Sequence, residues 1–466
     1  MAEAGVRVGD RIELRVESLG SQGEGVGRGE GLVVFVPGAV PGDVVRARVA
    51  ERRDRFARGR LEAVVTPSPD RRTPPCAVSE RCGGCPLMAL TPDAQRRLKR
   101  ERLAEVLRRI GDLPDAPVED VLEVAAGVDQ GGDPSLGYRA KAAMPVAAGP
   151  DGPVVGFYGR GSHDLVEAAD CPVTHPRARR IIAAVRDSAR ELGLPPYDER
   201  SRTGFVRHIV VRVAVGTPES LALVVTSASS HPGFEAFAER VMARVPDLTC
   251  LAQSVQPEAT NRILGQGPAR LLAGAPAITE RVGPLSLRLS PLAFFQVNPT
   301  VAEALYRRAV AELRLKGGEE VVDAHAGVGA IGLWAKAEGA GRVRGFETVA
   351  PAVADARENA RMNGLRADFE VGRAEMLYAK HYKGERRPDG VVLDPPRSGC
   401  APELLEALRA APPDRLVYVS CSPETLARDL RRLVADGRFV LERVVPVDLF
   451  PQTAHLEAIA VLHRGV

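Results

Sequence analysis

The stretch EVVDAHAGVGAIGLWAK at residues 320–336 decides the fold of this chain. It is typical of a buried strand that ends near Asp323, followed by a turn with glycines at 327, 329 and 332 and then by a helix. Short apolar strands, among them DGVVLD, LVYVS and AIAVLH, alternate with helices through the rest of the sequence. We therefore predict a doubly wound α/β domain over residues 286–466, with a ligand close to the glycine turn.

The glycines alone leave the ligand of this turn open. They satisfy the G-x-G-x-x-G pattern of dinucleotide-binding folds, and Glu347, after the next strand, suits a ribose diol in any nucleoside cofactor. The stretch VVLDPPRSG at 391–399 favours a site for a flat ring, because two successive prolines remove backbone donors and make a stiff wall instead of a phosphate cradle. The alternative without a ligand is a rigid turn that Asp394 caps.

The upstream sequence predicts two further domains. Residues 1–68 alternate apolar and polar positions between glycine-rich turns, which indicates a small β-barrel, and a proline-rich linker follows at 66–75. Residues 69–285 mix strand-like and helical stretches, which predicts an α+β domain with a largely antiparallel sheet. Within it, the helical segment 91–127 is a candidate to pack on the C-terminal domain.

Four of the seven cysteines suggest a metal site. Cys76, Cys82 and Cys85 have C-x5-C-x2-C spacing in a loop rich in proline and glycine, and Cys171 supplies a distant fourth thiolate. Four thiolates suit a 4Fe-4S cluster. Structural zinc and four unrelated buried thiols are the alternatives that the spacing leaves open.

Composition indicates an ordinary globular protein, with 45% hydrophobic and 26% charged residues and a net charge of only +3. Two stretches, 46–60 and 95–109, each hold seven basic and two acidic residues and suit phosphate binding, although a solvated surface gives the same pattern. The N-terminus lacks the apolar core of a signal peptide, and no apolar run reaches the roughly 20 residues of a membrane span. We expect a cytoplasmic, monomeric protein without a membrane partner.

Motifs in order along nearly the whole chain resemble the S-adenosylmethionine-dependent RNA (uracil-C5)-methyltransferase family, in its branch with a TRAM domain and an iron-sulfur cluster. The matching stretches are GEGVGR, LVVFVPGAVPGD, CAVSERCGGC, GYRAKA, GFYGRGSHDLV, CPVTH, SPLAFFQVN, VVDAHAGVGAIGL, VVLDPPRSG, YVSCSPETLARDL and LFPQTAHLE.

The resemblance implies specific roles for these stretches. Gln296, His325, Glu347 and Asp394 occupy positions that bind S-adenosylmethionine, with Glu347 on the ribose hydroxyls. The four cysteines named above occupy the positions that hold the 4Fe-4S cluster. The barrel is expected to be an OB-like TRAM module that binds RNA, and the C-terminal domain a Rossmann-like methyltransferase domain.

This sequence also departs from the family pattern. The family more often has an aromatic residue at the position of His325, Cys at Ala326, and Asp or Asn near Arg373, so the individual contacts there stay open.

A TRAM domain together with a cluster favours ribosomal RNA over transfer RNA as the substrate, by analogy at the level of the family.

Cys421 and Glu457 are the predicted catalytic pair. Uracil C5 attacks a methyl sulfonium only after a nucleophile adds at C6, and Cys421 lies directly after a buried strand and before a helix whose dipole would lower the pKa of the thiol. In the resembling family, the Glu of the H-x-E motif, here Glu457, removes the C5 proton as general base. A buried structural thiol and a surface ion pair are the alternatives for the two residues.

Two other functions share features of this sequence. A nicotinamide-dependent oxidoreductase shares the glycine pattern, and a non-catalytic RNA-binding protein shares the fold. An oxidoreductase has no use for a thiol paired with a terminal glutamate, and a relic would be expected to lose Cys421 or Glu457. Both residues are present, which favours the methyltransferase.

Overall fold

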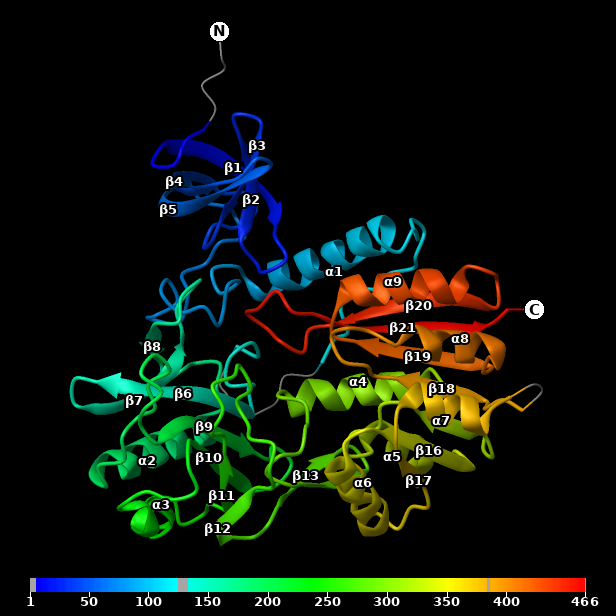
Figure 1. Cartoon of the computed structure of the whole chain (residues 1–466). Coiled ribbons are helices and arrows are strands. Elements are labelled where there is room, and N and C mark those ends of the chain that lie inside the picture. Colours follow the sequence, from blue (N-terminus) through cyan, green and yellow to red (C-terminus); the bar gives the residue numbers. More distant parts are fainter. Residues whose placement is uncertain (1–5, 125–132, 384–385, 466) are drawn as a thin grey trace. The chain divides into compact units, whose positions relative to one another are not determined.

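The computed structural model describes residues 6–124, 133–383 and 386–465 (Figure 1). Contacts divide the chain into two compact units. Unit 1 comprises Met1–Arg102, Phe157–Val166 and Phe450–His455, and unit 2 comprises Leu103–Gly156, Glu167–Leu449 and Leu456–Val466. The three predicted domains with boundaries at 68 and 285 stay a prediction, and residues 125–127 of the predicted helical segment lie outside the described residues.

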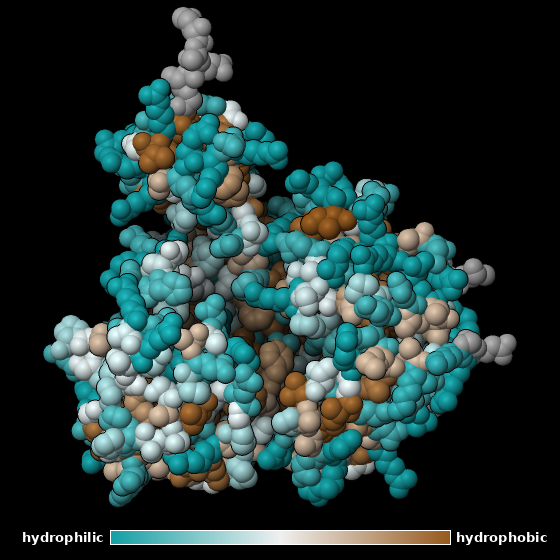
Figure 2. All heavy atoms as spheres, viewed as in Figure 1, coloured by the Kyte–Doolittle hydropathy of each residue, from teal (hydrophilic) through white to brown (hydrophobic). Residues whose placement is uncertain are grey.

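Unit 1 begins with a closed barrel, which the alternating pattern predicted, and residues at alternate positions such as Val34, Val36 and Val45 are fully buried inside it. Figure 2 shows mostly hydrophilic side chains over the barrel. Its strands pair in the order β1-β2-β3-β5-β4. They are β1 (Arg11–Leu19), β2 (Gly25–Gly29), β3 (Leu32–Val36), β4 (Val44–Arg52) and β5 (Phe56–Thr66).

Strand β2 lies in the glycine-rich stretch that the sequence predicted to be a turn, so that part of the prediction is wrong. The glycines let two strands come close together. A Cβ on Gly27 would lie 2.2 Å from the carbonyl oxygen of Arg15. Glycine in this strand therefore reflects strand spacing inside the barrel and not a chain reversal.

The rest of unit 1 is tied together by a buried glutamine on helix α1 (Pro92–Arg109), a helix that the sequence predicted. The Nε2 group of Gln95 donates to the carbonyl oxygens of Leu87 and Leu90 at 3.1 and 3.0 Å and to Gln452 Oε1 at 2.9 Å. The backbone N–H of Gln452 donates back to Gln95 Oε1. Segment Phe450–His455 is thereby fixed to α1 despite its distance in the sequence.

The C-terminal half of α1 belongs to unit 2. Leu103 and Leu107 are fully buried in the hydrophobic core under the C-terminal sheet. Further along, the backbone N–H of Glu119 donates to the carbonyl oxygen of Val444, and that of Val444 donates to Pro117. The described part of the predicted helical segment therefore packs on the C-terminal α/β fold from Leu103 onward.

The central sheet of unit 2 agrees with the prediction of a largely antiparallel sheet. Its strand order is β12-β11-β10-β9-β6-β7-β8, although β7 ends and β8 begins at residues divided between the two units. The pair β10–β11 is parallel, and the other registered pairs are antiparallel. The strands are β6 (Lys141–Gly149), β7 (Gly152–Tyr158), β8 (Leu165–Glu167), β9 (Val206–Val213), β10 (Ser220–Thr226), β11 (Cys250–Val255) and β12 (Arg270–Gly274). The helical turns beside them are α2 (Pro176–Glu191), η1 (Phe234–Ala236) and α3 (Phe237–Arg244).

The C-terminal sheet confirms the predicted doubly wound fold, with strand order β17-β16-β15-β18-β19-β21-β20. The first five strands are parallel, and β21 runs antiparallel to β19 and β20. The order reverses between β15 and β18, where ligands of such sheets bind. The strands are β15 (Glu320–Asp323), β16 (Arg342–Glu347), β17 (Asp368–Val371), β18 (Gly390–Leu393), β19 (Arg415–Ser420), β20 (Phe439–Val447) and β21 (Glu457–Arg464).

Helices cover both faces of this sheet, because right-handed crossovers on either side of β15 run in opposite directions (Figure 1). A hairpin of β13 (Ile278–Val282) and β14 (Leu285–Leu289) precedes them. The helices are α4 (Pro299–Ala311), α5 (Ala330–Ala337), α6 (Ala350–Met362), α7 (Ala374–His381), α8 (Pro402–Ala410) and α9 (Pro423–Val434). Among the described residues, no helix is both long and apolar enough to span a membrane.

Candidate active site

One edge of the C-terminal sheet collects most of the predicted site residues. Asp323 and Glu347 are the last residues of β15 and β16, and Asp394 directly follows β18. Cys421 directly follows β19, and Glu457 begins β21, which runs the other way and so starts at the same edge. Parallel strands deliver their carboxyl ends to one edge, and this edge is where α/β sheets bind ligands.

The register of β19 and β21 brings the predicted catalytic pair together. Ser420 is paired with Ala458, and the next antiparallel position aligns Cys421 with Glu457. The Glu457 side chain is only 2% exposed, and its Oε2 atom has no hydrogen-bond partner in the described structure. An unpaired buried carboxyl oxygen beside a thiol is costly for folding, which is typical of a group kept for chemistry.

The expected lowering of the Cys421 pKa is wrong for the free protein. Burial raises the pKa of this thiol to about 11, and the carboxylates of Glu457 and Asp394 add to the rise, whereas Arg397 opposes it. The helix α9 begins only at Pro423, after the cap residue Ser422, so the helix end is one residue further away than direct capping by the thiol would need. Two nearby carboxylates outweigh the helix dipole.

Three carboxyl groups at this edge hold their protons at unusually high pH. Burial raises the pKa of Asp323 to about 7, with a contribution from Glu347, and burial together with Asp323 raises that of Asp394 to about 7. Burial and then Asp394 raise the pKa of Glu457 to about 8, while Arg397 lowers it. A cation bound at this edge would favour the charged forms of these carboxyls and lower their pKa values.

The glycine turn donates backbone hydrogen bonds to two carboxylates, Asp323 and Glu347. Asp323 Oδ2 accepts a hydrogen bond from the Gly332 N–H at 2.9 Å, while its Oδ1 atom is buried without a partner. A Cβ on Gly332 would lie 3.2 Å from the Asp323 side chain, which explains the need for glycine. Glu347 Oε2 accepts from the Gly327 N–H at 3.1 Å.

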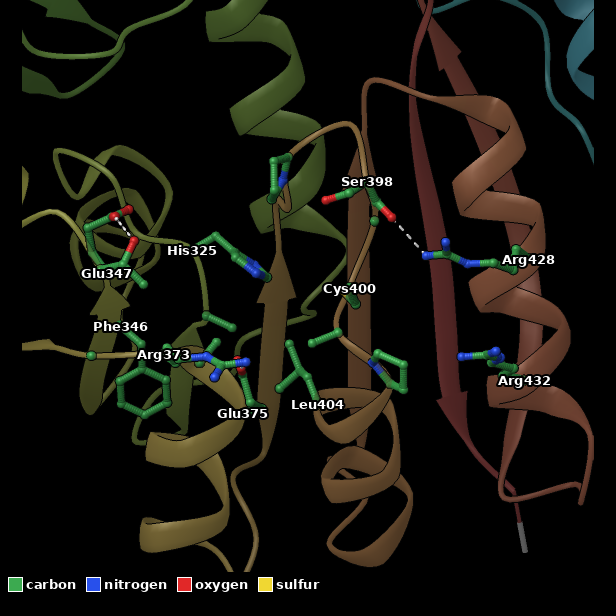
Figure 3. A pocket seen from close by; sticks show the side chains of 18 residues that line it. His325, Phe346, Glu347, Arg373, Glu375, Ser398, Cys400, Leu404, Arg428 and Arg432 are labelled. Atoms are coloured by element: carbon green, nitrogen blue, oxygen red, sulfur yellow. Dashed lines mark hydrogen bonds and ion pairs between the residues drawn. The ribbon is translucent and has the colours of Figure 1, made fainter. Parts of the chain in front are cut away.

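A cavity of about 500 Å³ opens beside this turn, on the side of helices α7 and α8 (Figure 3). His325, Glu347, Arg373, Glu375 and Pro396 are among the residues that line it. His325 and Glu347 point toward the hollow from neighbouring strand ends. Burial lowers the pKa of His325 to about 4, so the ring is neutral, and its buried Nδ1 atom has no partner in the described structure.

The loop after β18 is held in place by a buried carboxylate on α9. Asp429 Oδ2 accepts from the backbone N–H of Cys400 at 2.9 Å and from the Tyr418 hydroxyl at 2.8 Å. Arg428 donates to the Ser398 carbonyl oxygen at 2.9 Å. The two prolines that the sequence predicts to form one wall differ in this loop. Pro395 is buried, whereas Pro396 is exposed and lines the cavity.

Gln296 stands apart from this cavity. It is 7% exposed in the segment before α4, and it is absent from the described residues that line the cavity. The neighbouring Val297 accepts a hydrogen bond at its carbonyl oxygen from Ala140, at the start of the central sheet. The structure therefore brings His325 and Glu347 together at the cavity, and Cys421 with Glu457 at the strand edge.

The predicted metal ligands do not form a site in the described structure. Cys76, Cys82 and Cys85 belong to unit 1, and Cys171 belongs to unit 2. The Gly84 N–H donates to Cys82 Sγ at 3.4 Å, and Arg160 donates to the Cys82 carbonyl oxygen. Across the described residues, no three His, Cys, Asp or Glu side chains are arranged to hold a metal ion.

Comparison with known proteins identifies the family. A protein of Halalkalibacterium halodurans, described as an uncharacterized RNA methyltransferase, is 37% identical over 461 residues, which are 99% of this chain and 98% of the relative. This chain belongs to the RNA methyltransferase family. A further uncharacterized RNA methyltransferase, from Nostoc sp., is 38% identical to this RNA methyltransferase over 97% of its length and 96% of the relative.

Two family models and a solved structure refine this result. The model for the TRAM domain matches residues 5–61, and the model for tRNA (Uracil-5-)-methyltransferase matches residues 385–465. The crystal structure of Pyrococcus abyssi tRNA (uracil-54, C5)-methyltransferase in complex with S-adenosyl-L-homocysteine is 27% identical, with a TM-score of 0.76, and covers 97% of this RNA methyltransferase and 99% of that chain. The predicted TRAM barrel and methyltransferase are confirmed, and the oxidoreductase alternative is no longer favoured.

Sequence reasoning missed several groups around the catalytic pair of this RNA methyltransferase. Burial raises the pKa of the Tyr306 hydroxyl on α4 far above its usual value. The negative charges of Asp394, Glu457 and Asp323 raise it further. Tyr306 follows no motif and sits on an ordinary amphipathic helix face. Arg397 lies inside the quoted VVLDPPRSG stretch, where a cation next to an acidic site was a usable signal.

Proposed function

We propose that this chain transfers a methyl group from S-adenosylmethionine to C5 of a uridine in RNA, through a covalent adduct on Cys421. The observation that carries the proposal is the alignment of Cys421 with Glu457 at the sheet edge, next to Asp394. A thiol and a carboxyl that face one substrate provide the nucleophile and the base that methylation at C5 needs.

The residues at the sheet edge fit the methyl donor. Three buried polar atoms, Asp323 Oδ1, His325 Nδ1 and Glu457 Oε2, lack partners among the described residues, and two of these residues are acidic, which suits a cationic ligand. Glu347 is proposed to hold the ribose hydroxyls, with Gln296, His325 and Asp394 as further contacts. The donor supplies an electrophilic methyl group.

Two side chains carry out the proposed chemistry, Cys421 as the nucleophile and Glu457 as the base. The Cys421 thiolate forms a bond to C6, and the electrons of the C5–C6 double bond move onto C5 and O4. C5 then takes the methyl group as its bond to the donor sulfur breaks. The Glu457 carboxylate removes the C5 proton, the C5–C6 double bond forms again, and the thiolate leaves.

The raised pKa values fit an order of events. In the free chain, the pKa values of Glu457 near 8 and Cys421 near 11 keep both groups largely protonated at neutral pH. Positive charge brought to the edge lowers the pKa of both groups, because a nearby cation favours the charged forms. Arg397 already acts in this direction. The thiolate and the carboxylate are therefore proposed to form only in the loaded site.

A target uridine in structured RNA has to leave its stack to reach Cys421. Enzymes that act on bases flip the nucleotide into a pocket, at a cost of a few kcal/mol. We propose that the loop carrying Pro395 and Pro396 receives the flipped ring, because it is rigid and directly follows Asp394.

The RNA class is proposed from weaker support. The preference for ribosomal over transfer RNA rested on the barrel together with the cysteine cluster, and only the barrel has support from a family model. The solved relative of Pyrococcus abyssi acts on transfer RNA. Mapping of 5-methyluridine in both RNA pools of a gene-deletion strain and its parent tests the proposal: loss of a ribosomal position supports it, and loss of a transfer RNA position overturns the preference.

The 4Fe-4S cluster on Cys76, Cys82, Cys85 and Cys171 remains a proposal from resemblance alone. The described arrangement does not fit a metal site, so no step of the chemistry is routed through it. Iron and sulfide analysis of anaerobically purified chain tests it. About four irons per chain that disappear in Cys82→Ser support the cluster, and an iron-free folded protein excludes it.

Methyl incorporation is the direct test of the proposed function. Radiolabelled S-adenosylmethionine and RNA from the deletion strain should give labelled 5-methyluridine with the wild-type chain and none with Cys421→Ala. Donor affinity should stay nearly unchanged in Cys421→Ala, since Cys421 is not among the proposed donor contacts and does not line the cavity beside His325 and Glu347. Cys250→Ala, which changes a buried thiol in the central sheet, is the matched control and should stay active.

A further inference from the structure

Two cations lie side by side in the central sheet, and neither forms an ion pair within the part of the chain that the structure describes. Lys141 at the start of β6 and Arg212 on β9 are directly opposite each other in the antiparallel register. Arg212 is only 5% exposed, and Lys141 is partly buried. Like charges directly opposite each other destabilise a sheet, so this pairing costs stability in the free protein.

The surroundings of the pair do not neutralise it. Arg212 Nη2 donates to the carbonyl oxygen of Ala293 at 2.8 Å, but its Nη1 atom is buried without a partner. Among the described residues, neither cation has a carboxylate within ion-pair distance. Glu280 is the acid that Arg212 feels most, and its oxygens accept backbone N–H groups of Val215 and Gly216 instead.

The electrostatic cost appears in both cations. Burial lowers the pKa of Lys141 to about 7, and the charge of Arg212 adds to this fall. Burial also lowers the pKa of Arg212 to about 10. Buried charges are normally paired, so an unpaired cationic pair indicates that an anion completes the site when the protein works.

We propose that Lys141 and Arg212 bind a backbone phosphate of the RNA substrate. This inference rests on the proposed function and adds a substrate contact to it. A phosphodiester offers two non-bridging oxygens, one for each cation, and Lys141 is the member that solvent reaches.

The neighbouring segment favours a nucleotide over the carboxylate of the methyl donor. Arg212 donates to the carbonyl oxygen of Ala293, and the next residue, Phe294, is an aromatic residue that is 67% exposed. Exposed aromatics next to basic groups are typical of RNA surfaces. Neither cation is among the described residues that line the cavity beside His325 and Glu347.

Salt-dependent RNA binding by full-length variants tests the proposal. The probe is a short fluorescent oligouridine, and the variants are Lys141→Met and Arg212→Met. Loss of one phosphate contact to a single strand should flatten the slope of log affinity against log salt by about 0.7. Affinity at about 0.1 M salt should fall roughly tenfold in each variant, and S-adenosylhomocysteine affinity, measured by calorimetry, should not change.

Arg207→Met is the matched control. Arg207 is a buried arginine on the same strand as Arg212, but its Nη1 atom donates to the carbonyl oxygens of Gln256 and Glu258 within the protein. Its substitution should lower the melting temperature without changing the salt slope. If Arg212→Met does not fold, Lys141→Met decides, because its side chain is partly solvent-exposed and its loss also relieves the repulsion.

Two results would overturn the inference. If a folded Lys141→Met variant shows the wild-type slope of log affinity against log salt, Lys141 does not contact a phosphate. Weaker S-adenosylhomocysteine binding with unchanged RNA binding would assign the pair to the donor carboxylate instead. Neither result affects the proposed function, which fails separately if the wild-type chain incorporates no methyl group into RNA.

Discussion

At the scale of single residues, the proposed chemistry depends on acidic groups that lie close together. Each group, when charged, disfavours the charged form of its neighbour. Burial raises the pKa of Cys421, the charged forms of Glu457 and Asp394 raise it further, and burial also raises the pKa of both carboxyls. In the free protein, Glu457 and Cys421 are therefore largely protonated at neutral pH. In the proposed mechanism, the Cys421 thiolate forms only when cationic charge arrives, which would limit reaction of the thiol with oxidants in the solvent.

The pH dependence of methylation follows from these values. The base form of Glu457, with pKa near 8, and the thiolate of Cys421, with pKa near 11, both become more populated as pH rises. We expect kcat/KM to increase between about pH 6 and about pH 9. RNA binding by Cys421→Ala over the same range is the control, and a rate that falls across this range contradicts the assignment.

Sequence alone could predict these residues but not their ionisation. The motif around Cys421 and its position after a strand are local features, and so is the start of the last strand at Glu457. The pKa of a thiol depends on burial and on charges from other strands, which a local pattern does not contain. The helix dipole was the one local cue, and two carboxylates from other strands outweigh it.

At the scale of secondary-structure elements, the loop after β18 depends on helix α9. Asp429 is fully buried, and its substitution by Ala leaves the Cys400 N–H and the Tyr418 hydroxyl without acceptors. We expect Asp429→Ala to lose roughly 2 to 4 kcal/mol of unfolding free energy, measured in urea. Donor affinity should fall as well, because residues of this loop line the cavity.

The matched control for this prediction lies just beyond the same helix. Asp436 forms ion pairs with Arg409 and Arg438 at the surface. Asp436→Ala should leave both stability and donor affinity close to the wild-type values. Equal effects of the two substitutions would mean that the buried network does not support the loop.

Two adjacent aromatic residues in the segment before α4, Phe294 and Phe295, are expected to have different roles. Phe294 is 67% exposed, whereas Phe295 is 3% exposed and packs its ring edge-on against Tyr306 at 6.5 Å between centroids. Phe294→Ala should weaken oligouridine binding by roughly 1 to 3 kcal/mol, the value of one stacked base, with no change in melting temperature. Phe295→Ala should instead lower stability by roughly 3 to 5 kcal/mol. The reverse pattern in the two assays would refute this division.

The sequence predicted strands correctly where the apolar runs were long. It failed where the distance between neighbouring strands determines the residue type. The strands around Asp323 and Cys421 follow buried apolar runs and were predicted. Strand β2 was missed because its glycines serve close strand approach. Strands β17 and β20 were missed because they lie towards the sheet edge and carry exposed positions among the apolar ones.

At the scale of the whole molecule, we propose that the barrel of unit 1 adds an RNA contact to the one proposed on unit 2. The tip between β4 and β5 carries Arg52 and Arg55, and neither forms an ion pair among the described residues. The double change Arg52→Gln and Arg55→Gln should flatten the salt slope of RNA binding by about 0.7 for each lost phosphate contact. Donor affinity should stay unchanged in calorimetry. An unchanged slope would mean that this hairpin does not touch RNA.

The architecture of the whole chain was predictable because motif order is preserved over nearly all of it. The association of parts far apart in sequence was not predictable from local patterns. Segment Phe450–His455 docks on α1 through Gln95 and Gln452, and Lys141 meets Arg212 across two strands. Such contacts arise from tertiary topology, which composition and periodicity do not encode.

The covalent role of Cys421 is the central claim, and trapping the adduct tests it most directly. Glu457→Gln removes the base while leaving the nucleophile, so incubation with S-adenosylmethionine and unmodified RNA should yield a denaturation-stable protein–RNA band on a gel. The double variant Cys421→Ala with Glu457→Gln should give no such band. A band that persists without Cys421, or full methylation by Cys421→Ala, would contradict the account.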